Sequence, residues 1–175
     1  MSEKEVVLTY EGLKKLEEEL LEEGCEVLMT RNDENNIADK DKQDSISQTK
    51  QSDLTNRVNF INESNADLCI SIHMNKYEVS KYWGWQTFYS EDSEDGKKLA
   101  IAIQNGINKR IDKKNEREAL KISNIKIIDK TIIPVVIVEC GFLSNPEEAK
   151  LLQNDEYQEN LVHGICDGIK EYYNK

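Results

Sequence analysis

The order of apolar and polar positions divides the 175-residue chain into segments with the spacing of helices and of strands. Leucines recur at helical spacing over residues 8–23, and Gly24 follows them. This pattern predicts a helix that ends at the glycine. Residues 25–30 then predict a strand, and a helix that leads directly into a strand is typical of α/β proteins.

Two further apolar runs predict the interior of a sheet. Residues 134–139 are nearly all β-branched and begin with proline, which favours a central strand buried on both faces. Residues 67–73 are also strand-like and too apolar for an edge strand that faces water, and residues 85–89 predict another strand. We therefore expect an α/β fold, with a mixed sheet covered by helices on both faces.

Helical spacing also predicts the remaining elements. Residues 53–64 and 94–110 each carry an apolar face, and residues 161–172 carry the stripe of a last helix. Asn145 precedes a proline and two glutamates, which is the pattern of a capped helix start. Residues 32–52 are almost wholly polar, and such a long stretch without predicted structure is expected to be mobile or functional.

Composition narrows the function classes. A formal charge of −11 argues against a nucleic-acid protein, because phosphate binding requires a basic surface. No apolar run approaches the roughly 20 residues of a membrane span, and the chain as given shows no export signal. Of the four scattered cysteines, Cys25, Cys69 and Cys140 lie in or beside apolar runs, so buried and reduced thiols are expected. We expect a single domain.

Candidate chemistry lies where two predicted strands end. Sites in open α/β sheets form at the carboxyl ends of strands, and these runs end in His73 and Glu139. A metal ligand and a nearby carboxylate base would suit hydrolysis. Each residue also has a structural interpretation, as a hydrogen-bonded histidine or as the point where a strand leaves the core. Cys140 is a weaker candidate, as a nucleophile, because its neighbours predict burial.

Motifs in five segments narrow this choice. Residues 71–75 read Ser-Ile-His-Met-Asn and residues 138–145 read Val-Glu-Cys-Gly-Phe-Leu-Ser-Asn. Together with segments 24–31, 53–67 and 84–89, in this order, they resemble the zinc-dependent N-acetylmuramoyl-L-alanine amidases. The resemblance implies a peptidoglycan hydrolase that acts outside the cytoplasm, in the cell wall or spore cortex. Within the family, these motifs are most similar to the amidases that modify the spore cortex of bacilli and clostridia.

The resemblance also implies the site. These amidases hold zinc through a His, a Glu and a second His, with water in the fourth position. Their last ligand corresponds to His73, and their Glu corresponds to Glu3, with Glu5 as the alternative. On the pattern alone, both glutamates could simply be acids in the first turn of a helix. Glu139 corresponds to the catalytic carboxylate, and Asn75 would orient the histidine or contact the substrate.

The family's first histidine lies in an Asp-Pro-Gly-His-Gly motif upstream of that Glu, and no such motif occurs in this chain. His163 lies within the last predicted helix and is expected to be a surface or packing residue. Arg31 and Arg57 are expected to be structural. We therefore expect either a fragment of an active amidase or a degenerate member. A degenerate member would bind peptidoglycan, or an unidentified protein partner, without cleaving it.

Overall fold

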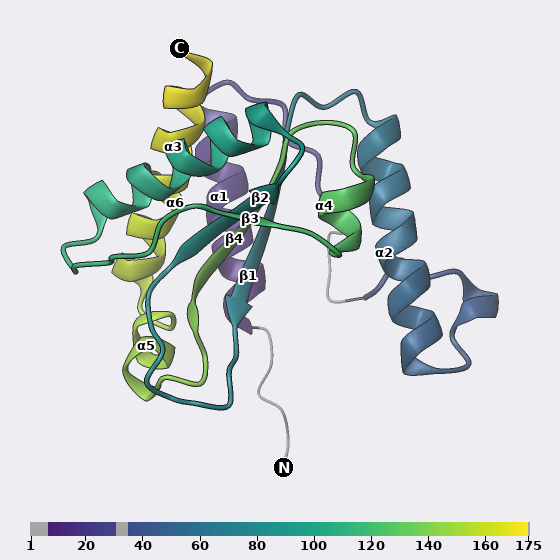
Figure 1. The fold of residues 1–175 in the computed structure, drawn as a ribbon, viewed down its shortest axis with the longest axis horizontal. Helices are drawn as coiled ribbons and strands as arrows, with labels where there is room; N and C mark the ends of the chain where they lie inside the picture. Colours follow the sequence, from purple (N-terminus) through teal and green to yellow (C-terminus); the bar gives the residue numbers. More distant parts are fainter. Residues whose placement is uncertain (1–6, 31–34, 175) are drawn as a thin grey trace.

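The computed structural model describes residues 7–30 and 35–174. Figure 1 shows their arrangement, with a central sheet and helices on either side. In chain order the elements are α1 (Val7–Glu22), η1 (Lys40–Lys42), α2 (Ile46–Glu63), β1 (Cys69–Asn75), β2 (Gln86–Ser90), α3 (Glu94–Arg110), β3 (Leu120–Ile122), α4 (Lys126–Lys130), β4 (Val135–Phe142), α5 (Pro146–Leu151) and α6 (Asp155–Tyr173).

The sheet is mixed, with its described strands in the order β1-β4-β2-β3. β4 runs parallel to β1 and antiparallel to β2, and β2 runs parallel to β3. The predicted central position of β4 is confirmed, since this strand pairs on both sides. The prediction that residues 67–73 are not an edge strand is wrong for the described sheet. Ile70 and Ile72 of β1 are nevertheless shielded, because they pack against the main core cluster.

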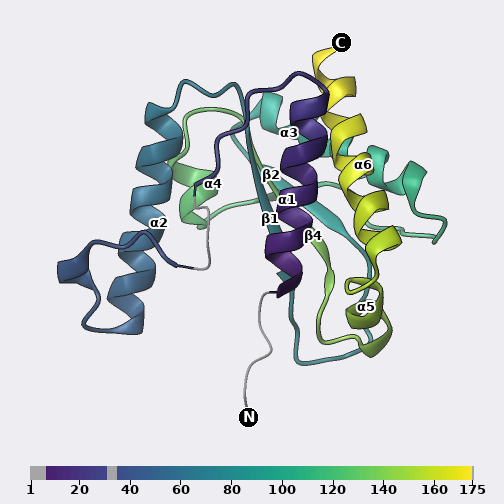
Figure 2. The same ribbon diagram turned by 180° about the vertical axis from the view of Figure 1, so that it is seen from behind.

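Helices cover both faces of the sheet, which confirms the predicted fold class. Figure 2 shows α1 and α6 side by side across one face, with α2 and α4 on the other side of the sheet. Val136 and Val138 of β4 point into the larger cluster with α3 and α6 residues, while Val135 and Ile137 point into a smaller cluster with Ile128. Each face of β4 therefore removes apolar side chains from water, which is the main stabilising term.

Glycines let α3 and α6 approach closely. A Cβ at Gly106 would lie 2.1 Å from the carbonyl oxygen of Gly164, and one at Gly168 would lie 2.4 Å from the Cα of Ile103. Real Cβ atoms do not reach such distances, so the two helix backbones touch directly at these positions. The contact buries Ile103 and Ile107 completely between the sheet and the helix pair.

The structure corrects two predictions near the beginning of the chain. Residues 25–30 form no strand in the described part of the chain, and Cys25 is exposed rather than buried. A strand needs a hydrogen-bonded neighbour to satisfy its backbone groups, and none of the described strands pairs with this segment. Cys140 and Cys166 are buried and Cys69 is partly buried, and all four thiols are free.

Residues 35–52, the described part of the predicted polar stretch, are more ordered than expected, since they include η1 and the first turns of α2. α2 begins at Ile46 instead of residue 53, because the Ser45 hydroxyl accepts a hydrogen bond from the Gln48 amide and caps the helix. A Ser followed three residues later by Gln is a helix-start signal that the sequence analysis overlooked. The short elements β3 and α4 were also not predicted. No helix in the described ranges is both long and apolar enough to cross a bilayer.

Candidate active site

His73 and Glu139 lie beside each other near the carboxyl ends of two neighbouring parallel strands. Their Cα atoms are partners in the pairing of β1 with β4, and Gln86 of β2 pairs with Glu139 from the other side. Paired residues project to the same face of a sheet. His73, Glu139 and Gln86 therefore form one row across three strands, called here the active-site row. Both β1 and β4 run toward the loops and the short helix α5 at the lower side of Figure 1.

Glu139 has the environment of a carboxyl group that can exchange protons near neutral pH. Its side chain is partly buried, and its Oε2 atom is buried with no hydrogen-bond partner among the described residues. Burial raises the pKa of Glu139 from 4.5 to about 7, because desolvation disfavours the charged form. A carboxylate with such a pKa is matched to general acid–base work at neutral pH.

His73 is the exposed member of the active-site row. Its Nε2 atom lies 2.9 Å from the hydroxyl oxygen of Ser71, two residues earlier on the same face of β1. Asn75 ends the strand, and its carbonyl oxygen accepts a hydrogen bond from the Leu143 amide at 2.8 Å. The two motif segments of the sequence analysis are therefore joined directly by backbone contacts.

Gln86 is held on both ends of its side chain. Its Oε1 atom accepts a hydrogen bond from Arg117 at 2.9 Å, and its Nε2 atom donates to the carbonyl oxygen of Glu118, also at 2.9 Å. Arg117 also donates from Nε to the carbonyl oxygen of Trp83, and its guanidinium lies 4.9 Å from the centre of the Phe142 ring. The sequence analysis missed both residues, and only the strand pairing identifies Gln86 as a neighbour of Glu139.

A buried carboxylate that the sequence analysis assigned only to a helix start lies behind this row. Glu148 of α5 is 1% exposed and accepts hydrogen bonds from the backbone amides of Gly84 and Phe142. Burial raises the pKa of Glu148, while the hydrogen bonds from Phe142 and Gly84 oppose that rise. Glu147, the preceding acid in the same helix turn, is exposed. The burial of Glu148 therefore depends on tertiary contacts and not on its position at a helix start.

The other residues singled out in the sequence lie away from the row. His163 on α6 lies 3.5 Å from the Glu19 carboxylate of α1, as expected of a helix-surface residue. Arg57 pairs with Asp53 at 2.9 Å and holds its own helix, which agrees with a structural role. Cys140 is buried on the face opposite Glu139, and burial raises the pKa of its thiol to about 12. Such a thiol is not activated for attack, so the structure gives no support to a cysteine nucleophile.

The donors expected for zinc are only partly within the described residues. Glu3 and its alternative Glu5 lie outside them. Arg31, which is expected to be structural, also lies outside the described residues. An imidazole is a suitable zinc donor, and His73 supplies one in the same row as the carboxyl group of Glu139, the candidate base. No group of three or more His, Cys, Asp or Glu side chains that could hold a metal ion occurs in the described part of the chain. The described residues therefore fit part of a zinc site and need at least one further ligand.

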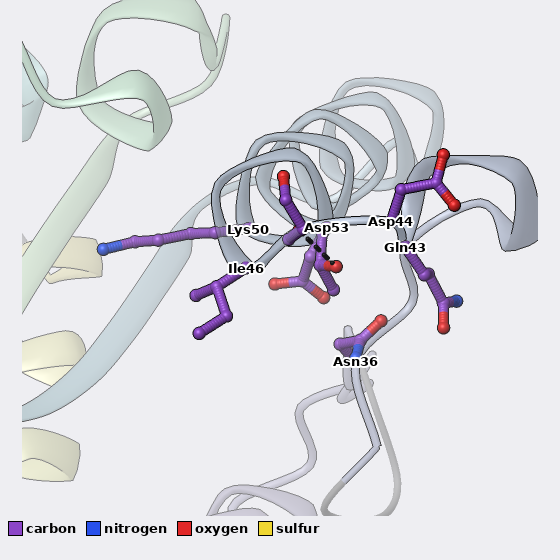
Figure 3. A pocket seen from close by; sticks show the side chains of 8 residues that line it. Asn36, Gln43, Asp44, Ile46, Lys50 and Asp53 are labelled. Carbon is purple, nitrogen blue, oxygen red and sulfur yellow. Dashed lines mark hydrogen bonds between the residues drawn. The ribbon is translucent and has the colours of Figure 1, made fainter.

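A surface pocket lies elsewhere, where the segment before α2 meets the first turns of that helix (Figure 3). The side chains labelled there are Asn36, Gln43, Asp44, Ile46, Lys50 and Asp53. None of them belongs to the active-site row, so this hollow is separate from the candidate chemistry.

The family model for N-acetylmuramoyl-L-alanine amidases matches residues 1–171. The chain belongs to this family of hydrolases. It is 35% identical over 166 residues to the germination-specific N-acetylmuramoyl-L-alanine amidase of Bacillus subtilis (strain 168), which covers 95% of this chain and 69% of that protein.

Solved structures agree with this assignment. The CwlD amidase from Clostridioides difficile, determined in complex with the GerS lipoprotein, has a TM-score of 0.91 and 37% identity over 95% of this chain and 85% of that one. An N-acetylmuramoyl-L-alanine amidase from Clostridium difficile 630 has a TM-score of 0.81 and 27% identity over 96% and 83% of the two chains. The predicted family and its germination-specific branch are confirmed by these relatives.

Proposed function

We propose that this protein hydrolyses the amide between N-acetylmuramic acid and L-alanine in peptidoglycan, with Glu139 as the general base and then the general acid. The observation that carries the proposal is the active-site row, in which the buried carboxylate oxygen of Glu139, with no hydrogen-bond partner among the described residues, lies beside His73. A carboxyl group with a pKa of about 7 can accept a proton from the attacking water and return it to the leaving amine.

We further propose that the enzyme uses zinc. His73 would be a ligand, and Glu3 would be a second ligand, with at least one more required. Zinc bound there would supply Lewis acidity, which would polarise the substrate carbonyl and lower the pKa of water. Since Glu3 and His73 are one ligand short of the three that hydrolytic zinc requires, the 175-residue chain is expected to retain no stoichiometric zinc after dialysis.

The loop that follows β1 supports a role for Asn75 in substrate binding. Tyr77 is 57% exposed and Tyr82 is 37% exposed, with their rings 5.1 Å apart in an edge-on arrangement. The Tyr77 amide donates to the Ser144 hydroxyl oxygen, and Asn145 donates to the carbonyl oxygen of Tyr82. These contacts hold an aromatic rim beside Asn75 at the end of β1, where a sugar or peptide could bind.

The setting follows from the relatives. One is named a germination-specific amidase, so we propose action on spore-cortex peptidoglycan outside the cytoplasm. The CwlD amidase forms a complex with a lipoprotein, and a protein partner for this chain is proposed on that basis.

The test is digestion of purified peptidoglycan by the complete gene product, including any coding sequence upstream of Met1. We expect zinc-dependent appearance of L-alanine amino termini without new reducing ends. The 175-residue chain, assayed in parallel, is expected to release none. Glu147→Gln, a change at an exposed residue of α5, is the matched control for Glu139→Gln. Retention of full activity by Glu139→Gln would exclude the assigned base. If Cys140→Ser then abolished release, a cysteine mechanism would replace it.

The second candidate is a domain that binds peptidoglycan without cleaving it, because the family resemblance identifies only two candidate zinc ligands in this sequence, Glu3 and His73. Co-sedimentation with insoluble peptidoglycan distinguishes the two. Binding by a complete gene product that neither retains zinc nor releases peptide would support this alternative.

A further inference from the structure

The pairing of β1 with β4 is interrupted immediately after the candidate catalytic pair. His73 pairs with Glu139, but the next pair is Asn75 with Phe142. β4 therefore carries one more residue than β1 between these pairs, which is a β-bulge. Gly141 lies in this bulge with φ +156°, a conformation that disfavours a side chain. Bulges next to active sites redirect neighbouring side chains, and here the neighbour is Glu139.

The buried carboxylate of Glu148 occupies the space beside the bulge. Its Oε2 atom accepts the amide hydrogen of Phe142 at 2.8 Å, and its Oε1 atom accepts that of Gly84 at 2.7 Å. A Cβ added at Gly141 would lie 2.9 Å from this carboxyl group. The Glu148 carboxylate can therefore occupy this position because Gly141 has no side chain.

The general preference for acidic residues in the first turn of a helix does not explain the burial of Glu148. Glu147 is an equivalent acid in the first turn of α5 and remains exposed, whereas Glu148 is 1% exposed. Burying a carboxylate is costly unless hydrogen bonds compensate it. Those bonds go to two backbone amides on different segments, one before β2 and one at the end of β4.

We propose that Glu148 is a positioning residue for the amidase reaction. By fixing the bulge through its hydrogen bond from the Phe142 amide, Glu148 sets the direction in which the Glu139 side chain projects from β4. By holding Gly84, two residues before Gln86, it fixes the start of the strand that lies on the other side of Glu139. One carboxylate therefore aligns two of the three strands of the active-site row. The inference rests on the proposed function, because it assigns Glu148 a role in that reaction.

The test compares Glu148→Gln with Glu147→Gln, which removes a charge from the same helical turn. In Glu148→Gln, one backbone amide would face a side-chain amide donor instead of an acceptor. We expect hydrogen exchange at Gly84 and Phe142 to accelerate about tenfold or more, and the side-chain amide signals of Gln86 to move in NMR spectra. In the zinc-loaded gene product, kcat should fall about 10- to 100-fold while KM changes less than about threefold. Glu147→Gln should resemble the wild type in all these measurements.

The proposal is overturned if Glu148→Gln lowers thermal stability but leaves the Gln86 signals and kcat unchanged, since the residue would then be merely structural. If Glu148→Gln does not fold, Gly141→Ala replaces it. Its methyl group would displace the carboxylate and should give the same pattern of changes. Wild-type signals and kcat in Gly141→Ala would also overturn the proposal. The NMR and exchange measurements need no activity, so failure of the proposed function is distinguishable from failure of this inference.

Discussion

Replacing Glu139 by glutamine is expected to stabilise the metal-free protein at alkaline pH, although it should remove activity. Glu139 is the partly buried member of the active-site row whose Oε2 atom has no hydrogen-bond partner among the described residues. Burial raises its pKa from 4.5 to about 7. The folded protein therefore holds this proton more tightly than the unfolded chain does.

The sign and size of the effect follow from proton linkage. Between about pH 4.5 and 7 the folded state binds more protons at this site, so stability falls as the pH rises through this window. Above pH 7 the full cost of the buried charge is present. A rise in pKa from 4.5 to about 7 corresponds to at most about 3 kcal/mol. Because the side chain is partly accessible to solvent, which screens its charge, we expect about 1–2 kcal/mol.

The assay is urea denaturation of wild type and Glu139→Gln in the presence of a chelator, at pH 5 and at pH 8. The difference in the free energy of unfolding should be small at pH 5 and should favour the variant at pH 8. Glu147→Gln, at an exposed position, is the control and should show no such divergence. If the difference in the free energy of unfolding were equal at pH 5 and pH 8, the claim that burial of the ionised Glu139 side chain destabilises the fold would be refuted.

Three further outcomes are expected. In the zinc-loaded gene product, Glu139→Gln should retain zinc while turnover falls about 10²- to 10⁴-fold, as measured by peptide release and metal analysis. His73→Ala should lose both zinc and activity, so an active, zinc-replete variant would contradict the assigned ligand. Gly164→Ala should destabilise the fold by about 1–3 kcal/mol or more in urea, because its Cβ would lie 2.6 Å from the Cα of Ile107. An unchanged urea midpoint for Gly164→Ala would show that α3 and α6 are not in direct backbone contact.

The sequence alone determined the strand ends that carry the candidate site. Apolar runs that stop at His73 and Glu139 predicted two polar strand tips, and the motifs around them indicated the family that the comparisons confirmed. The central position of β4 and the cap at Asn145 were also predicted. These features depend on residue types within a few positions of each other, and local periodicity and capping are written directly into the sequence.

Contacts between distant segments decided which residues form strands, which residues join the active-site row and which acid is buried. The sequence placed residues 25–30 in a strand, but they form none in the described part of the chain, because a strand also needs a neighbour. Gln86 joined the active-site row only through the register of β2 with β4. Glu147 and Glu148 are adjacent residues of the same type, yet only Glu148 accepts the two backbone hydrogen bonds that compensate its burial. Register and burial are set by contacts across the whole fold, so only the tertiary structure could distinguish a surface acid from the one behind the active site.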